Sequence, residues 1–130
     1  MAGAFSQDWS PQVIAACNQA ILDLLDSQEE NARITIHTEM DVLLGELLLE
    51  NPCGSVDLVT GVATLVPGPR LEEAPATGVA AYASIRDGAG HPHRSIPCMQ
   101  GDSPVPGFCI LNSLFVVAGS PVQIMSIQLS

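Results

Sequence analysis

The residue types that could bind a metal ion are concentrated in the second half of the chain. His91, His93, Cys98 and Cys109 supply the nitrogen and sulfur donors that Zn²⁺ prefers in tetrahedral sites. Their spacing is H-x-H-x4-C-x10-C, and the chain contains no C-x-x-C pair. This spacing matches no common zinc site. The sequence therefore favours two hairpin histidines and two core thiols, and it predicts no metal and no cofactor.

Nucleophilic catalysis by cysteine is the next chemistry that the composition allows. A Cys–His pair with an orienting acid needs a cysteine in an electropositive, partly exposed position. Cys17, Cys53, Cys98 and Cys109 all lie beside apolar or turn residues, and no sequence signature of an activated thiol surrounds them. A small Cys-dependent hydrolase is therefore the weaker alternative, and we expect no catalytic residues.

The acidic residues favour solvated loops and turns over a catalytic or calcium site. Glu72 and Glu73 are adjacent, but residues 71–75 lack the alternating oxygen donors and the glycine of a calcium loop. Asp87 and Asp102 are followed by Gly88 and Ser103, as is common in turns.

Charge narrows the classes of partner. The chain of 130 residues has 14 acidic residues against 4 basic ones, none of them lysine, for a formal charge of −10. This balance argues against nucleic acid, whose phosphates require clustered Lys and Arg, and against anionic membranes. Only 14% of residues are charged, so much of the surface must be uncharged, and apolar surface often marks contact sites.

The first residues contain neither a basic stretch nor a long apolar run. They therefore do not predict a signal peptide, and no segment is apolar for long enough to predict a transmembrane helix. Synthesis in a reducing cytoplasm follows, with four free thiols and no disulfide. We interpret residues 1–9 as an N-terminal arm and residues 10–130 as a single domain.

One amphipathic helix is predicted at the start of this domain. Ser10 can cap its N-terminus, and Pro11 suits the first helical position. Apolar residues then recur at spacings of three and four until the helix ends near Asp26. The predicted apolar face consists of Val13, Ile14, Cys17, Ala20, Ile21, Leu24 and Leu25.

In the rest of the chain, apolar residues recur with a period of two, which is typical of strands. We interpret residues 42–49 as a strand buried on both faces rather than a short helix, and residues 51–54 as a turn. In the last strand, residues 122–129, the apolar positions switch from even to odd numbers, which suggests a β-bulge or a crossing between environments. The other predicted strands are residues 32–37, 56–59, 62–66, 78–86, 93–99, 108–111 and 114–118. One helix and eight or nine short strands predict a mainly β fold, a jelly-roll-like β-sandwich with one N-terminal α-helix.

The segment of residues 76–90 is the most informative part of this pattern. It reads as a strand that runs into a tight hairpin turn at Asp87 and Gly88. Together with residues 34–38, 44–47 and 51–52, the segments ATGVAAYASIRD (76–87) and VAGSPVQI (117–124) resemble a family of small virion structural proteins. The family is encoded among the head genes of tailed bacteriophages, and the resemblance covers roughly residues 12–129.

The resemblance implies a function in assembly. Some family members are capsid cement (decoration) proteins with a jelly-roll fold. The chain would then bind the outer surface of the major capsid protein lattice and stabilise the head. It would be synthesised in the host cytoplasm and located on the outer capsid surface of the virion. A tail or head–tail connector component is the alternative.

Several residues are predicted to form interfaces. Phe5 and Trp9 lie outside the helical periodicity and could attach the arm to the capsid. We also predict association into a homodimer, for two reasons. Some strand residues that we expect to face outward are small or apolar, and sheet edges are expected to be exposed. The outward-facing residues are Ala81, Ala83, Ile96 and Val116, and Tyr82 is included in the predicted interface.

Overall fold

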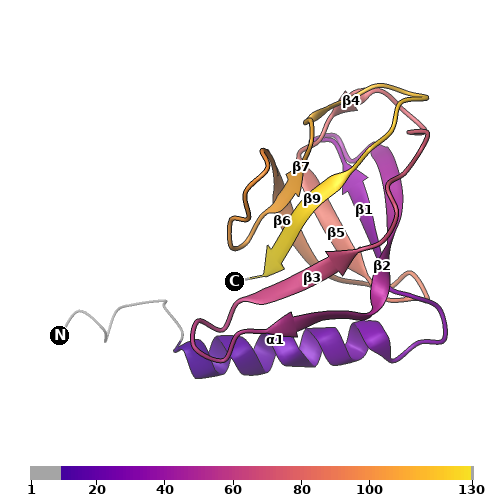
Figure 1. Ribbon diagram of the computed structural model, residues 1–130. Helices are drawn as coiled ribbons and strands as arrows, with labels where there is room; N and C mark the ends of the chain where they lie inside the picture. Colours follow the sequence, from indigo (N-terminus) through magenta and orange to yellow (C-terminus); the bar gives the residue numbers. More distant parts are fainter. Residues whose placement is uncertain (1–9, 130) are drawn as a thin grey trace.

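The computed structural model describes residues 10–129, which form one helix and nine strands (Figure 1). The elements in chain order are α1 (Pro11–Asp26), β1 (Arg33–His37), β2 (Leu43–Val56), β3 (Ala63–Pro67), β4 (Gly78–Val79), β5 (Tyr82–Arg86), β6 (Pro92–Gln100), β7 (Cys109–Leu111), β8 (Phe115–Val116) and β9 (Ile124–Leu129).

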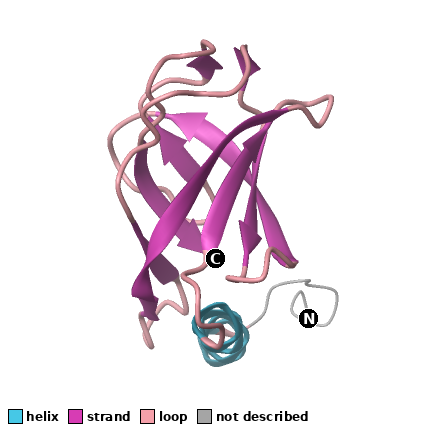
Figure 2. Cartoon of the chain, turned by 90° about the vertical axis from the view of Figure 1, so that its right-hand side faces the viewer, coloured by secondary structure: helices cyan, strands magenta, loops and turns pink. Residues whose placement is uncertain are grey.

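Seven of the strands close into a barrel in the order β1-β2-β3-β9-β7-β6-β5. Neighbouring barrel strands are antiparallel except β6 and β7, which run parallel. The remaining two strands, β4 and β8, form a small separate sheet. Figure 2 shows this sheet at one end of the barrel and α1 across the opposite end.

The predicted mainly β fold with one leading helix is confirmed. The predicted jelly-roll arrangement is not confirmed, because β1 pairs with β2 on one side and with β5 on the other. This double pairing closes the seven strands on themselves, and a single barrel encloses the core. Alternation of apolar residues reveals each strand but does not say which strands pair, so sandwich and barrel look alike in sequence.

The predicted helix is confirmed at both ends. The Ser10 hydroxyl accepts a hydrogen bond from the backbone N–H of Val13, at 3.2 Å, and Pro11 opens the helix. The helix ends at Asp26, and the Ser27 hydroxyl donates to the carbonyl of Leu24.

The face that the helix buries differs from the predicted one. The buried residues are Ala15, Asn18, Leu22 and Leu25, whereas Val13, Cys17 and Leu24 are exposed. The prediction placed only apolar residues on the buried face and therefore omitted Asn18, which hydrogen-bonds to the barrel.

The strand predicted at residues 42–49 exists, but two details of that prediction are wrong. Leu44, Leu47 and Leu49 are buried while Leu43 and Leu48 are exposed, so only one face of this half of β2 lies in the core. Residues 51–54, predicted as a turn, continue β2, whose register with β3 shifts between Leu49 and Gly54. A run of leucines hides the alternation of the strand because both faces are apolar.

The predicted irregularity in the last strand is confirmed as a bulge. Ile110 pairs with Ser126 and Leu111 pairs with Ile124, which leaves Met125 as the extra residue on β9. Met125 is exposed, whereas Ile124 and Ile127 on either side are buried. The change of parity in the sequence thus marks the residue at which the strand realigns its inward face.

Candidate interaction surface

The barrel end farthest from α1 carries exposed apolar side chains from several segments. They come from the turn between β1 and β2, from the β4–β8 sheet and from the residues that flank them (Figure 1). Met40 is 84% exposed and Phe115 is 59% exposed. We call this region the distal apolar end; its residues are Met40, Val42, Leu43, Val79, Phe115 and Val117.

The backbone of the β1–β2 turn holds Met40 in its exposed position. The Thr38 N–H donates to the carbonyl of Val42 at 3.0 Å, and the Thr38 hydroxyl accepts from the Val42 N–H at 3.1 Å. Asp41 has a φ of 67°, in the left-handed region that Asp tolerates better than most residues. These bonds fix a tight turn whose tip points away from the core.

The β4–β8 sheet packs against this turn. Val79 and Phe115 are paired across the two strands, so their side chains lie on the same face of the small sheet. A Cβ atom at Gly78 would lie 2.7 Å from Cγ2 of Thr38, so a larger residue there would have to displace the Thr38 side chain. The distal apolar end is therefore assembled from segments far apart in sequence.

Tyr82, a predicted interface residue, is engaged within its own chain. Its ring stacks on that of His37, with centroids 4.9 Å apart and planes inclined by 9°. Its hydroxyl donates a hydrogen bond to the Asp41 carboxylate, and this bond raises the pKa of Tyr82. Tyr82 thus braces the turn that presents Met40.

His37 links the same turn to the barrel wall. Its Nε2 atom hydrogen-bonds with Thr35 Oγ1 at 2.8 Å, and its Nδ1 atom lies 3.4 Å from Asp41 Oδ1. Burial lowers the pKa of His37, which favours the neutral ring. Thr, His and Asp are the residue types of a hydrolytic triad, but Thr35 is only 5% exposed, so its hydroxyl cannot reach a substrate. This cluster is a structural brace.

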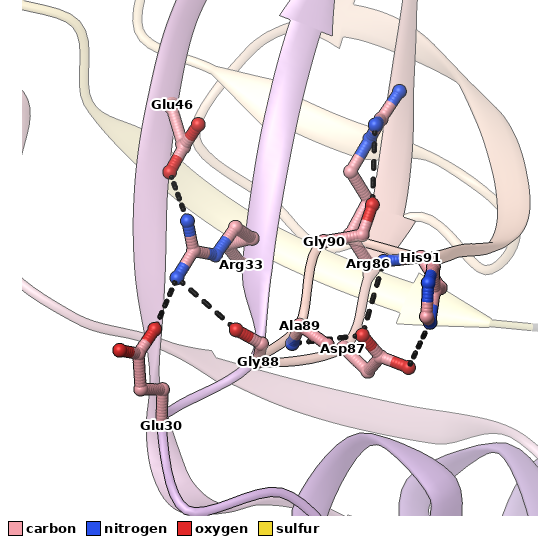
Figure 3. A network of polar contacts seen from close by, with 9 residues as sticks. All are labelled: Glu30, Arg33, Glu46, Arg86, Asp87, Gly88, Ala89, Gly90 and His91. Carbon is pink, nitrogen blue, oxygen red and sulfur yellow. Dashed lines mark hydrogen bonds and ion pairs between the residues drawn. The ribbon is translucent and has the colours of Figure 1, made fainter.

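The hairpin between β5 and β6 is organised by the buried carboxylate of Asp87 (Figure 3). Its Oδ1 accepts from the backbone N–H groups of Ala89 and His91, at 2.9 and 3.0 Å. Its Oδ2 accepts from His93 Nε2 at 2.9 Å. The His93 bond, followed by the backbone bonds, lowers the pKa of Asp87. Asp87 is a turn residue, as predicted, and it binds both histidines of the candidate zinc set.

Arg33 fastens this hairpin to β1 (Figure 3). Its guanidinium lies 2.7 Å from Glu46 and 3.1 Å from Glu30, and it donates to the Gly88 carbonyl at 3.4 Å. Glu30 is largely exposed and Glu46 is about half-exposed, so these ion pairs contribute mainly to position.

The candidate zinc residues do not converge. His93 and Cys98 lie five residues apart on the extended strand β6, which separates their backbones by about 16 Å. Across residues 10–129, no group of three or more His, Cys, Asp or Glu side chains is arranged to hold a metal ion.

Two of the four thiols, Cys53 and Cys109, are not activated as nucleophiles. Burial raises the pKa of Cys53 to about 12, and the neighbouring Cys98 thiol, followed by burial, raises the pKa of Cys109. Both groups are thus protonated at neutral pH, the opposite of what a cysteine nucleophile requires. Cys17 is exposed on α1. The predicted loop glutamate Glu72 pairs with Arg70 at the surface.

Three of the residues predicted to face outward are in the core. Ala83 is fully buried, and Ile96 and Val116 are 3% and 5% exposed. Ala83 and Ile96 are paired across β5 and β6, so both point into the barrel. Alternation in the sequence identified the two faces of these strands but assigned the wrong face to the interior. Phe5 and Trp9 lie outside the described residues.

The distal apolar end was missed by the sequence reasoning. Met40, Val79 and Phe115 are single apolar residues in turns and very short strands, where the alternation that marks a buried face cannot be recognised. An apolar residue in a tight turn, such as Met40 between Glu39 and Asp41, was the available signal.

Comparison with known proteins finds no matching family model, no matching curated protein and no matching solved structure. Among the described residues, α1 is too short and too polar to cross a membrane, and so no membrane-spanning helix is found.

Proposed function

We propose that this chain is a structural virion protein of the capsid cement (decoration) type. It binds the outer surface of the major capsid protein lattice through its distal apolar end and stabilises the head. The family resemblance supplies the class of partner, and the exposed apolar side chains at one end of the barrel are the observation that carries the docking site.

Burial of apolar area drives the contact. Complete burial of one large apolar side chain contributes about 1.5–3 kcal/mol. The six side chains of the distal apolar end are between 41% and 84% exposed. Covering them would contribute on the order of 5 kcal/mol per copy before the costs of association. The free energies of many such contacts add over the lattice, and in this way a small protein can oppose the internal pressure of the packaged genome.

Charge is expected to orient the partner surface and to raise the rate of association. Glu39 and Asp41 flank Met40 in the turn and are exposed, so the apolar contact has an acidic rim. The chain carries a net charge of −10, which favours a basic partner surface and a contact formed faster at low salt.

The proposal includes a homodimer but does not depend on a jelly roll. The jelly-roll fold belongs to what the resemblance implies, and a closed barrel can present the same kind of rigid end. A tail or head–tail connector component is the alternative.

Binding of variants to empty capsids tests the proposed docking site. We expect the M40S/F115S variant to bind empty heads at least about tenfold more weakly than the wild type, while the barrel stays folded. The matched control is L58S/V59S, which removes two exposed apolar side chains from the β2–β3 turn beside α1. Equal binding by wild type and M40S/F115S would refute the docking site.

Copy number then distinguishes cement from connector. Quantitative mass spectrometry of purified virions should find the chain in hundreds of copies if it covers the lattice. About a dozen copies would indicate a connector ring, and its absence from the particle would refute a structural role in the virion.

A further inference from the structure

Cys98 and Cys109 lie directly opposite one another in the barrel wall. They are the first of three residue pairs that join the parallel strands β6 and β7. In-register neighbours of a parallel pair project from the same face of the sheet. The two thiols are therefore neighbours, and the Cys98 thiol raises the pKa of Cys109.

The spacing suits a covalent link. Adjacent strands lie about 4.8 Å apart, within the roughly 4.4–6.8 Å between Cα atoms that a disulfide spans. Cys109 belongs to the buried core, and Cys98 packs against that core but keeps partial exposure. One thiol of the pair is therefore accessible and the other is protected.

The other two cysteines have no such neighbour. Cys17 lies on the exposed side of α1. Cys53 is buried in β2, with its Sγ 3.8 Å from the carbonyl of Leu22. Selective pairing of Cys98 with Cys109 follows from position alone.

We propose that Cys98 and Cys109 form a modification site that closes into an intrachain disulfide when the protein meets a small-molecule disulfide oxidant such as oxidised glutathione. The Cys98 thiolate attacks one sulfur of the oxidant, releasing one glutathione thiolate and forming a mixed disulfide. Cys109 then loses its proton, and its sulfur attacks Cys98 Sγ and releases the second glutathione thiolate. The two cysteines lose two protons and two electrons, and the electrons reduce one oxidant molecule to two thiols.

Accessibility sets the order of these two steps. Cys98 reacts first because it is the partly exposed thiol. Cys109 is buried beside Cys98, and both this neighbour and burial raise the pKa of Cys109 and favour its protonated form. Opening of the mixed disulfide by Cys109 is consequently the slower step.

The link would close the weakest seam of the barrel. Three residue pairs join β6 to β7, as few as at any seam of the barrel, and this seam alone is parallel, a pairing slightly less stable per residue than the antiparallel one. Separating these strands would open the barrel into a sheet with two edges. A disulfide at the first pair prevents that opening, so oxidation should slow unfolding. This inference is independent of the proposed capsid role.

Peptide mapping tests the proposal on the full chain. The folded protein is incubated with oxidised glutathione, remaining thiols are alkylated, and the chain is digested without reduction. We expect a cross-linked pair of peptides containing Cys98 and Cys109, lighter by two hydrogen atoms than the two free peptides. Counted after denaturation, the link should consume two of the four thiols, a glutathione adduct on exposed Cys17 being distinguished by its mass, while the protein stays monomeric on a non-reducing gel.

A variant and a kinetic readout complete the test. C98A should leave Cys109 alkylatable only after denaturation, and it should abolish the slowing of unfolding that oxidation produces in the wild type. The matched control, C17A, removes the exposed thiol and should form the link as the wild type does. Four thiols that remain alkylatable once the oxidised protein is denatured, a persistent glutathione adduct on Cys98, or cross-links only through Cys17 would each overturn the proposal.

Discussion

Asn18 is the residue whose replacement best tests how the helix is held on the barrel. It is 1% exposed and lies in the middle of α1. Its Nδ2 donates to the carbonyls of Gly61 and Leu129, at 2.8 and 3.2 Å, and its Oδ1 accepts from Arg94 Nη1 at 3.2 Å. One side chain thus ties the helix to the β2–β3 turn, to the end of β9 and to β6.

The expected cost follows from these bonds. Asn18→Ala leaves two carbonyls and one guanidinium N–H without this partner, at about 1 kcal/mol for each neutral group and about 1.5 kcal/mol or more for the charged one. Alanine recovers roughly 0.6 kcal/mol through its higher helix propensity. We therefore expect the free energy of unfolding to fall by about 3 kcal/mol, and Tm by roughly 12 °C for a chain of this size.

Urea denaturation followed by circular dichroism measures this change. The matched control is Gln19→Ala on the same helix, because Gln19 is exposed and bonds only to exposed Asp23 among the contacts observed. The control should stay within about 0.5 kcal/mol of the wild type. An Asn18→Ala protein that is equally close to the wild type would refute the role of this amide as the main tie.

Three further outcomes are expected. First, burial lowers the pKa of His37 in the folded state, so its contribution to stability is complete above the unfolded value of about 6.5 and is lost as pH falls through the folded pKa. His37→Phe should therefore flatten the loss of stability between pH 7 and pH 5. An unchanged dependence of Tm on pH in thermal melts would argue against this role. Second, the pKa of Asp87 is lowered, so its contribution to stability is present above about pH 4 and is lost on further acidification. Asp87→Asn should therefore show a smaller difference in Tm between pH 5 and pH 3 than the wild type. The control is Asp102→Asn, at an exposed position. Third, deletion of residues 1–8 should leave the Tm of the barrel unchanged but weaken co-sedimentation with empty heads, and normal co-sedimentation would contradict an attachment role for the arm.

The sequence predicted local structure where short-range chemistry decides it. Ser10 and Pro11 define a helix start through hydrogen bonding and fixed backbone geometry, and Asp87 and Gly88 define a hairpin in the same way. The bulge at Met125 was visible because a change of parity leaves a trace in the order of residues.

What the sequence did not reveal depends on contacts between distant segments. Alternation along β5 and β6 divides their residues into two faces, but only the closure of the barrel decides that Ala83 and Ile96 face inward. Asn18 was invisible for a related reason, since a polar residue on a helix is assigned to the solvent unless distant carbonyls are known to meet it.

Closure of the barrel also changes how this protein can associate. The expected dimer rested partly on exposed sheet edges, but each of the seven barrel strands has a neighbour on both sides over part of its length, which leaves little free edge for strand addition. Among residues 10–129, free edges remain on β6 before Cys98 and on β4 and β8, which are two residues long and lie at the distal apolar end. A partner, whether a second copy or a capsid subunit, is therefore expected to contact the end of the barrel by covering apolar side chains. Such a contact should survive moderate salt, because apolar burial is not screened, while its rate of formation should fall as salt screens the acidic rim.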